Sequence, residues 1–204
     1  MDQDLGGVIL AGGTSRRLGR DKASEVLLGR TLLERTAERL VPLVDEIIVV
    51  RRAGQSIPEL DLPVPVVVVE DAYPDTGPLG GIFTGLRAAS SERCLVVACD
   101  MPLLQASLLR YLAACATGHD GAVPVNKERF PEPICAVYGK RCLPAMERRL
   151  REGLYKITAF FGLVDINLIP FADWQPHDPG ALSLVNANTE EALGRVAGVI
   201  EAGQ

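Results

Sequence analysis

The first half of the chain alternates between short continuous apolar runs and longer segments in which apolar residues recur every three or four positions. The continuous runs are rich in valine and isoleucine, and they predict strands that are buried on both faces. They occupy residues 7–12, 45–50, 64–70 and 94–100. The segments with the helical period predict helices over residues 31–44, 80–90 and 105–116.

The second half of the chain has a less regular pattern. Short apolar runs predict strands at residues 121–126, 134–138, 166–171 and 182–186. Helical patterns cover residues 142–153 and 189–202. The segment 172–181 is rich in proline and aspartate and predicts a surface loop.

Alternation of strands and helices is typical of the α/β class, in which a mostly parallel sheet is covered by helices on both faces. The expected architecture is therefore three-layered. A length of 204 residues suits a single domain over residues 1–204.

Charge and composition narrow the range of functions. The net charge is −5 and the chain has no long basic run, which argues against a nucleic-acid partner. The apolar runs are shorter than the roughly 20 residues that cross a bilayer, and the acidic N-terminus does not resemble a signal peptide. We therefore expect no membrane association and a cytoplasmic location. The five cysteines lack metal-binding spacing and are expected to be reduced thiols.

A glycine turn and a basic cluster follow the first predicted strand. Gly12 and Gly13 have no Cβ, so a ligand can come close to the backbone and phosphate oxygens can meet its N–H groups. The basic residues of this segment are Arg16, Arg17, Arg20 and Lys22. The segment predicts a phosphate site, although a solvated basic turn is the alternative. Its spacing matches neither standard nucleotide-binding fingerprint.

Polar residues also follow other predicted strands, and ligands of parallel sheets bind at the carboxyl ends of strands. Asp100 directly follows a buried run, where a carboxylate is costly unless something pairs with it. A Mg²⁺ ion would pair with it, and a role as a helix cap is the alternative. Asp71 follows another strand, while Asn186 and Asn188 alternate along a third and could face one side. His119 and His177 show no catalytic arrangement.

Five segments, in order, resemble those of the molybdenum cofactor guanylyltransferases. The first, LAGGTSRRLGRDK at 10–22, is similar to the family's L-A-G-G-x-S-x-R-M-G-x-D-K, with Leu18 in place of methionine. The others are GPLGGI (77–82), CDMP (99–102), PEPICAVY (131–138) and VNANTEEAL (185–193). The resemblance spans residues 8 to about 193 and implies a single Rossmann-like nucleotidyltransferase domain.

The resemblance also implies a reaction and a set of site residues. GTP and the molybdenum-bound pterin cofactor would give the guanine dinucleotide form and pyrophosphate, with Mg²⁺ as the metal. The nucleotide would be held by Leu10, Ala11, Gly12, Gly13, Lys22, Asp71 and Asp100. Arg17, Lys22 and Asp100 would act in catalysis, Asp100 also as the metal ligand. Asn186 and Asn188 would line the pterin side. Molybdenum-insertion proteins and molybdoenzyme chaperones are further expected partners.

The chain departs from the family's pattern at one position, and several alternative functions remain open. The family often has an asparagine after its second strand, where this chain has Val50, Arg51 and Arg52. A cytidylyltransferase that uses CTP is one alternative, although such proteins more often read L-A-A-G at the first loop. Gly12 would give a purine closer approach. A sugar-phosphate nucleotidyltransferase and a non-catalytic GTP-binding protein are the others.

Overall fold

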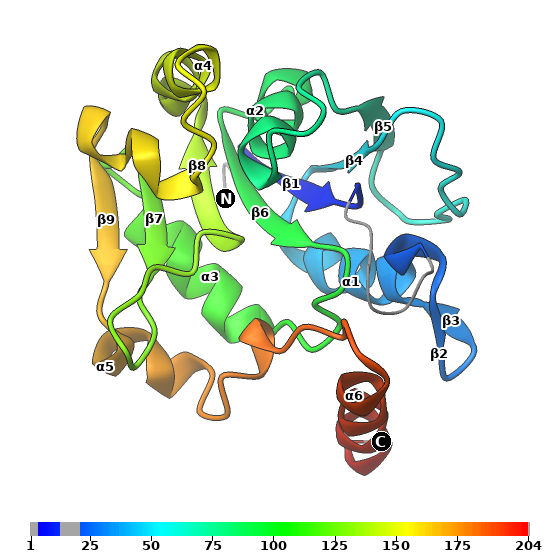
Figure 1. Ribbon diagram of the computed structural model, residues 1–204. Coiled ribbons are helices and arrows are strands. Elements are labelled where there is room, and N and C mark those ends of the chain that lie inside the picture. Colours follow the sequence, from blue (N-terminus) through cyan, green and yellow to red (C-terminus); the bar gives the residue numbers. More distant parts are fainter. Residues whose placement is uncertain (1–3, 13–20, 204) are drawn as a thin grey trace.

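A computed structural model describes residues 4–12 and 21–203 and places seven strands in one sheet (Figure 1). The strands are β1 (Leu5–Leu10), β4 (Glu46–Arg51), β5 (Val66–Glu70), β6 (Arg93–Ala98), β7 (Gly121–Pro124), β8 (Cys135–Gly139) and β9 (Ile166–Ile169). Their order across the sheet is β5-β4-β1-β6-β8-β7-β9. The predicted α/β class is confirmed.

The sheet is mostly parallel, as predicted. Strands β5, β4, β1 and β6 are parallel neighbours, and β7 is parallel to β9. Strand β8 is antiparallel to both β6 and β7. The carboxyl ends of β1, β4, β5 and β6 therefore lie along one edge of the sheet, where a parallel sheet places its ligands.

Helices cover both faces of the sheet and give the three predicted layers (Figure 1). The helices are α1 (Leu32–Leu40), α2 (Pro78–Ala88), α3 (Ala106–Cys115), α4 (Leu143–Arg151), α5 (Phe171–Trp174) and α6 (Glu190–Ala202). Helices α1 and α3 pack with Ile9 on one face, and α2 and α4 pack with Val8 on the other. Neighbouring strand residues enter opposite cores because side chains alternate along a strand.

Helix α1 is shorter than the predicted span 31–44, for a local reason. Thr31 caps it in a capping box, in which its hydroxyl accepts from the Glu34 N–H and the Glu34 carboxylate accepts from the Thr31 N–H. After Leu40 the chain tightens into a 3-10 turn at Val41–Leu43. Pro42 has no N–H to continue the α-helical ladder.

Helix α2 uses its glycines for close packing rather than for flexibility. A Cβ at Gly85 would lie 2.3 Å from Val8 Cγ1, and one at Gly80 would lie 2.7 Å from the Tyr73 carbonyl oxygen. Both distances are too short for real atoms. The glycines therefore let α2 lie against β1 and against the segment that follows β5.

Two predictions for the C-terminal third are wrong. The predicted loop at 172–181 contains α5 and a 3-10 turn at Gln175–His177, and Trp174 is fully buried with its indole N–H donating to the Val125 carbonyl at 2.8 Å. The predicted strand at 182–186 is a 3-10 turn at Leu182–Leu184 followed by extended chain. The buried Asp178 carboxylate holds this turn by accepting from two backbone N–H groups.

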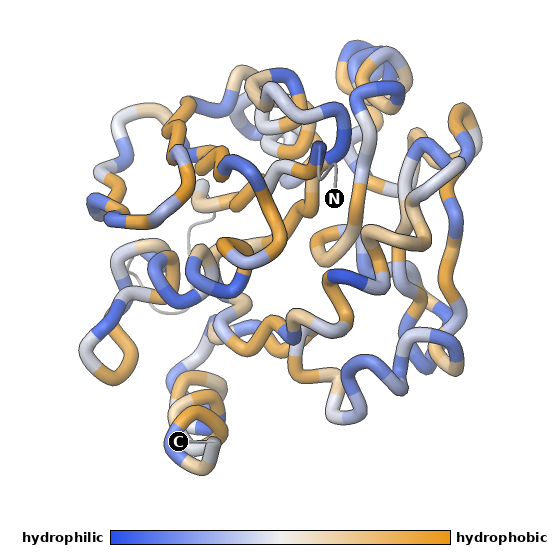
Figure 2. Tube along the Cα trace, turned by 180° about the vertical axis from the view of Figure 1, so that it is seen from behind, coloured by the Kyte–Doolittle hydropathy of each residue, from blue (hydrophilic) through white to orange (hydrophobic). Residues whose placement is uncertain are grey.

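The C-terminal helix α6 lies apart from the sheet, and Figure 2 shows both hydrophobic and hydrophilic residues along it. Its buried residues Leu193 and Val196 pack with Leu32 of α1 and with the short hairpin of β2 (Val26–Leu27) and β3 (Arg30–Thr31). Thr189 is its N-cap. This third cluster fixes the chain between the sheet and α6, which includes Asn186 and Asn188.

All five cysteines are free, as predicted, and all but Cys115 are buried. Burial raises the pKa of Cys94 and Cys135 to about 12, so these thiols stay protonated at neutral pH. Within the described residues, no helix is long and apolar enough to span a bilayer.

The close approach at Gly85 gives a direct test of the α2 packing. Gly85→Ala should destabilise the protein by about 1–3 kcal/mol, because a methyl group in a filled core forces neighbouring atoms apart. The matched control is Gly194→Ala in α6, where a Cβ meets nothing within 4 Å. That change should be neutral or stabilising by up to about 1 kcal/mol, since alanine is the better helix former. Urea unfolding measures both, and equal effects at the two sites would contradict the packing argument.

Candidate active site

A pocket of about 710 Å³ lies at the carboxyl ends of the parallel strands. We call it the strand-end pocket. Its lining comes from chain segments that follow β1, β4, β5, β6 and β7, together with the segment that precedes α6. The predicted site residues that line it are Leu10, Gly12, Lys22, Asp71, Asp100, Asn186 and Asn188. The fold thus brings together seven of the residues singled out from the sequence.

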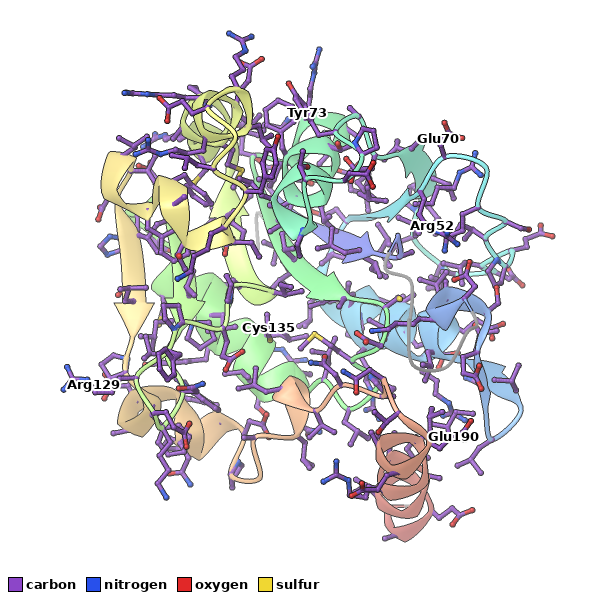
Figure 3. The ribbon with its side chains drawn as sticks, in the orientation of Figure 1. Arg52, Glu70, Tyr73, Arg129, Cys135 and Glu190 are labelled. Carbon is purple, nitrogen blue, oxygen red and sulfur yellow. The ribbon has the colours of Figure 1, made fainter. Side chains whose placement is uncertain are left out.

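The strand order divides the lining of the strand-end pocket into two sets, which we call its halves, with β6 and Asp100 between them. One half is lined by residues after β1, β4 and β5 and by the start of α2. The other is lined by residues 132–135, which lead into β8, and by the segment before α6. In Figure 3, Arg52 marks the half beside β4 and Cys135 marks the half beside β8. A pocket of this form can hold two ligands whose reactive groups meet near Asp100.

An ion pair between Lys22 and Asp100 lies inside the strand-end pocket. The Lys22 ammonium is 2.5 Å from Asp100 Oδ2, and their side chains are 19% and 6% exposed. The sequence predicts that Asp100 needs a partner and leaves Mg²⁺ and a role as a helix cap open, while the resemblance implies Mg²⁺. In this structure Lys22 pairs with it. A charge-assisted hydrogen bond of this kind is worth more than a neutral one because little water competes for either group.

Backbone contacts fix Asp100 at the end of β6. The Cys99 N–H donates to the Leu10 carbonyl at 3.1 Å, and the Cys99 carbonyl accepts from the Thr36 hydroxyl at 3.0 Å. Helix α3 begins six residues later, at Ala106, with Gln105 at its N-cap position. Asp100 is therefore not a helix cap, and the alternative interpretation of this residue is excluded.

The two asparagines face the strand-end pocket although their segment is not a strand. Ala187, between them, is fully buried, and its N–H donates to the Asp100 carbonyl at 2.8 Å. The backbone is extended at Val185 and Thr189, on either side of this segment, and Asn186 and Asn188 both line the pocket while Ala187 is buried. The two asparagines therefore share one pocket although the predicted strand does not form, and one hydrogen bond ties their segment to Asp100.

Asp71 enters the strand-end pocket from the end of β5. Its Oδ1 accepts from the Tyr73 N–H at 2.9 Å and from the Thr84 hydroxyl at 3.2 Å. Burial raises the pKa of this carboxyl, and these two hydrogen bonds oppose the rise. Asp71 is thus a fixed acceptor at a partly desolvated position, suited to a ligand that presents hydroxyl or N–H donors.

The first loop is described only at its two ends. Leu10 and Gly12 line the pocket, whereas Ala11 is fully buried, with its N–H bonded to the Val50 carbonyl and its carbonyl to Gln55. A Cβ at Gly12 would lie 3.3 Å from the backbone nitrogen of Arg52, so this glycine also permits close approach of the segment after β4. The remaining predicted residues, Gly13, Arg16, Arg17 and Arg20, lie outside the described residues.

The structure also shows which residues the sequence did not identify. Arg52 lines the pocket and lies 3.6 Å from the Asp21 carboxylate, while Gln55 is buried behind it. Neither follows from a local pattern, because their partners are about thirty residues earlier in the chain. His119 instead pairs with Asp165, and His177 stacks on Tyr111, so both histidines have contacts away from the pocket lining.

The fold and the strand-end pocket define a nucleotidyltransferase-like α/β protein, and comparison with known proteins identifies its family. Residues 7–164 match the MobA-like NTP transferase domain, and the chain belongs to this family. It is 33% identical to the molybdenum cofactor guanylyltransferase of Desulfosudis oleivorans, over 97% of this chain and 96% of that one. It is 35% identical to the probable molybdenum cofactor guanylyltransferase of Methanosarcina mazei, over 94% and 89% of the two chains.

A solved structure supports the fold assignment. The molybdopterin-guanine dinucleotide biosynthesis protein A from Archaeoglobus fulgidus superposes with a TM-score of 0.78 at 24% identity, covering 97% of this chain and 99% of that one. The Rossmann-like nucleotidyltransferase fold expected from the sequence is therefore confirmed.

The Lys22–Asp100 pair should contribute to the stability of the ligand-free protein. Lys22→Met keeps the aliphatic stem but leaves the buried Asp100 carboxylate without its partner, so we expect a loss of about 3–5 kcal/mol. The control is Arg148→Met, which breaks an exposed ion pair with Glu152 and should change stability by no more than about 0.5 kcal/mol. Urea unfolding at neutral pH compares them. A loss at Lys22 no larger than at Arg148 would show that the pair is not stabilising.

Proposed function

We propose that this protein transfers GMP from GTP to the molybdenum-bound molybdopterin cofactor, giving the guanine dinucleotide form and pyrophosphate. The names of its relatives support this activity, since they align over nearly the whole chain. The observation that carries the proposal is the Lys22–Asp100 pair, which places a cation and a carboxylate at the junction of the two halves of the strand-end pocket.

The two substrates are assigned to the two halves. GTP would occupy the half formed by Leu10, Gly12 and Asp71, close to the first loop with its basic residues. The pterin would occupy the half beside β8, with Asn186 and Asn188 along its wall. Asp100 then lies between the α-phosphate of GTP and the terminal phosphate of the pterin, where the new bond forms.

The residues around Asp100 suit Mg²⁺. This ion takes oxygen ligands and is commonly held by one or two carboxylates together with substrate phosphates. Asp100 supplies a carboxylate, and Asn186 and Asn188 supply amide oxygens from the same pocket. The described residues contain no cluster of three or more histidine, cysteine or acidic side chains, so the proposed ion would need substrate phosphates among its ligands. When bound, Mg²⁺ would neutralise charge on the phosphate oxygens.

The proposed reaction is an in-line displacement at phosphorus. An oxygen of the pterin's terminal phosphate attacks the α-phosphorus of GTP, the bond from that phosphorus to the bridging oxygen breaks, and pyrophosphate leaves with the electron pair. Such chemistry depends on positioning and charge neutralisation more than on a protein nucleophile. Lys22 would leave Asp100 for the triphosphate and neutralise the charge that develops on the leaving group. Arg17 is proposed to assist it.

The setting of this activity is also part of the proposal. We expect the enzyme to work in the cytoplasm, with molybdenum-insertion proteins and molybdoenzyme chaperones as partners. The choice of GTP over CTP rests on Gly12 and on the names of the relatives.

A panel of nucleotides tests the proposed function. With Mg²⁺ present, GTP should raise the melting temperature more than equal concentrations of ATP, CTP or UTP, because the ligand with the lowest Kd stabilises the folded protein most. A ligand at 100 times its Kd stabilises it by about 2.7 kcal/mol. With molybdopterin added, GTP should release pyrophosphate.

Each alternative has a different outcome in the same panel. A larger shift and faster turnover with CTP would indicate a cytidylyltransferase. Turnover with a sugar phosphate in place of the pterin would indicate a sugar-phosphate nucleotidyltransferase. Binding of GTP without pyrophosphate release under any of these conditions would indicate a non-catalytic binding protein.

A further inference from the structure

The side chain of Gln55 makes an unusual set of contacts just behind the strand-end pocket. Gln55 follows β4 and is only 4% exposed. Its Nε2 donates to the Ala11 carbonyl at 3.0 Å and to Asp21 Oδ1 at 2.8 Å. Its Oε1 accepts from the Arg52 N–H at 3.0 Å. Both N–H bonds and the oxygen of this buried amide are therefore used.

The two acceptors of Gln55 lie at opposite ends of the first loop. Ala11 directly follows β1, and Asp21 directly precedes the 3-10 turn at Lys22–Ser24. Asp21 is the N-cap of that turn, since its Oδ1 also accepts from the Ala23 N–H at 3.0 Å. One amide group thus ties the start of the loop to the residue that begins the turn.

The same turn carries Lys22. Its ammonium reaches Asp100 at 2.5 Å. Gln55 is therefore linked to Lys22 by its hydrogen bond to Asp21 and then by the backbone, since Asp21 and Lys22 are consecutive residues. The Gln55–Asp21 and Lys22–Asp100 contacts are both partly buried, so each is stronger than it would be in solvent. A shift of Asp21 would therefore move Lys22 relative to Asp100.

Glutamine has the chemistry that this position requires. A carbonyl oxygen and a carboxylate on one side need two donors, and a backbone N–H on the other needs an acceptor. A primary amide offers two donors and an acceptor in one plane, whereas a carboxylate offers acceptors only. The partners also fix the orientation of the amide, since a flipped group would set its oxygen against the Ala11 carbonyl and the Asp21 carboxylate.

Neighbouring contacts hold Gln55 itself in place. The Gln55 N–H donates to the Arg52 carbonyl at 3.2 Å, and the Arg51 guanidinium donates to the Gln55 carbonyl. Arg52 also pairs with Asp21 at 3.6 Å, and Arg51 with Glu70 of β5 at 2.7 Å. The segment after β4 is thereby fixed to the sheet and forms a support for the first loop.

We propose that Gln55 is a positioning residue for the triphosphate: by joining Ala11 to Asp21, it sets where Lys22 meets the phosphates. Gln55 does not itself touch the nucleotide in this scheme. The inference rests on the proposed function in taking a nucleoside triphosphate as the ligand, and it does not depend on which base is preferred.

A double-mutant cycle on GTP affinity tests this role. Gln55→Met keeps the length of the side chain and removes its hydrogen bonds, and it should raise the Kd for GTP with Mg²⁺ by about tenfold, the equivalent of one buried hydrogen bond. If Gln55 acts through Lys22, the variant with both Gln55→Met and Lys22→Met should bind GTP no more weakly than Lys22→Met alone. Calorimetric titration measures all four Kd values.

The matched control is Asn167→Ala in β9, which removes an amide donor to the Cys115 carbonyl, 3.0 Å away at the far edge of the sheet. It should lower stability and leave the Kd for GTP unchanged. Wild-type affinity in Gln55→Met, or a double variant weakened by the product of the two single effects, would overturn the positioning role.

A second variant and a second nucleotide allow the cycle to decide the role of Gln55 in every case. If Gln55→Met does not fold, Gln55→Ala enters the same cycle, since it removes the amide and leaves room for water to bond the freed polar groups without adding a charge beside Asp21. If the wild-type protein prefers CTP, the guanylyl function fails, and the cycle run with CTP still decides the role of Gln55. Failure of the wild-type protein to bind any nucleoside triphosphate would overturn both proposals.

Discussion

The ion pair between Lys22 and Asp100 is the interaction on which the arrangement of the strand-end pocket depends. The chain places a carboxylate at the end of the buried strand β6, a position that is costly for an unpaired charge. The carboxylate is paired with Lys22, which lies 78 residues earlier in the segment that follows β1. The pair forms because β1 and β6 are parallel neighbours and end at the same edge of the sheet.

This pair also links the ligand-free protein to its proposed chemistry. A lysine and a carboxylate that neutralise each other can separate when phosphates and a divalent cation arrive together, since the anion then takes the lysine and the cation takes the carboxylate. Neither charge is left unpaired in either state. The Ala187 hydrogen bond to the Asp100 carbonyl adds the asparagine segment to the same point. In the proposed reaction, the two halves of the pocket would meet where the charges are exchanged.

Much of the fold follows from local sequence. The strands of the parallel part read as continuous apolar runs because both of their faces are buried, and the helices between them keep an apolar stripe for one face of the sheet. The C-terminal third was harder to predict because its structure depends on distant partners. The Trp174 N–H donates to the Val125 carbonyl, 49 residues earlier, and the hydroxyl of Ser183 in the turn after Asp178 accepts from the Gln105 N–H, 78 residues earlier. Neither contact has a local signature.

In the candidate site, too, some residues could be predicted from local sequence and others depend on distant partners. Asp71, Asp100 and the two asparagines could be identified because polar residues at the ends of apolar runs are conspicuous, and their motifs resemble a known family. Lys22 could be identified in the same way, but its pairing with Asp100 could not be predicted, because the strand order that brings β1 beside β6 is a property of the whole sheet. Gln55 could not be identified for a similar reason. Its amide donates to Ala11 and Asp21 from the segment after β4, the strand that neighbours β1.

The most direct test of the exchange between Lys22 and Asp100 is a crystal structure of the protein with GTP and Mn²⁺ as an anomalously scattering substitute for Mg²⁺. The predicted result is that the Lys22 ammonium has moved from Asp100 to the triphosphate, while the metal is bound to the Asp100 carboxylate. A complex in which the nucleotide and metal are bound but the Lys22–Asp100 pair is intact would contradict the account.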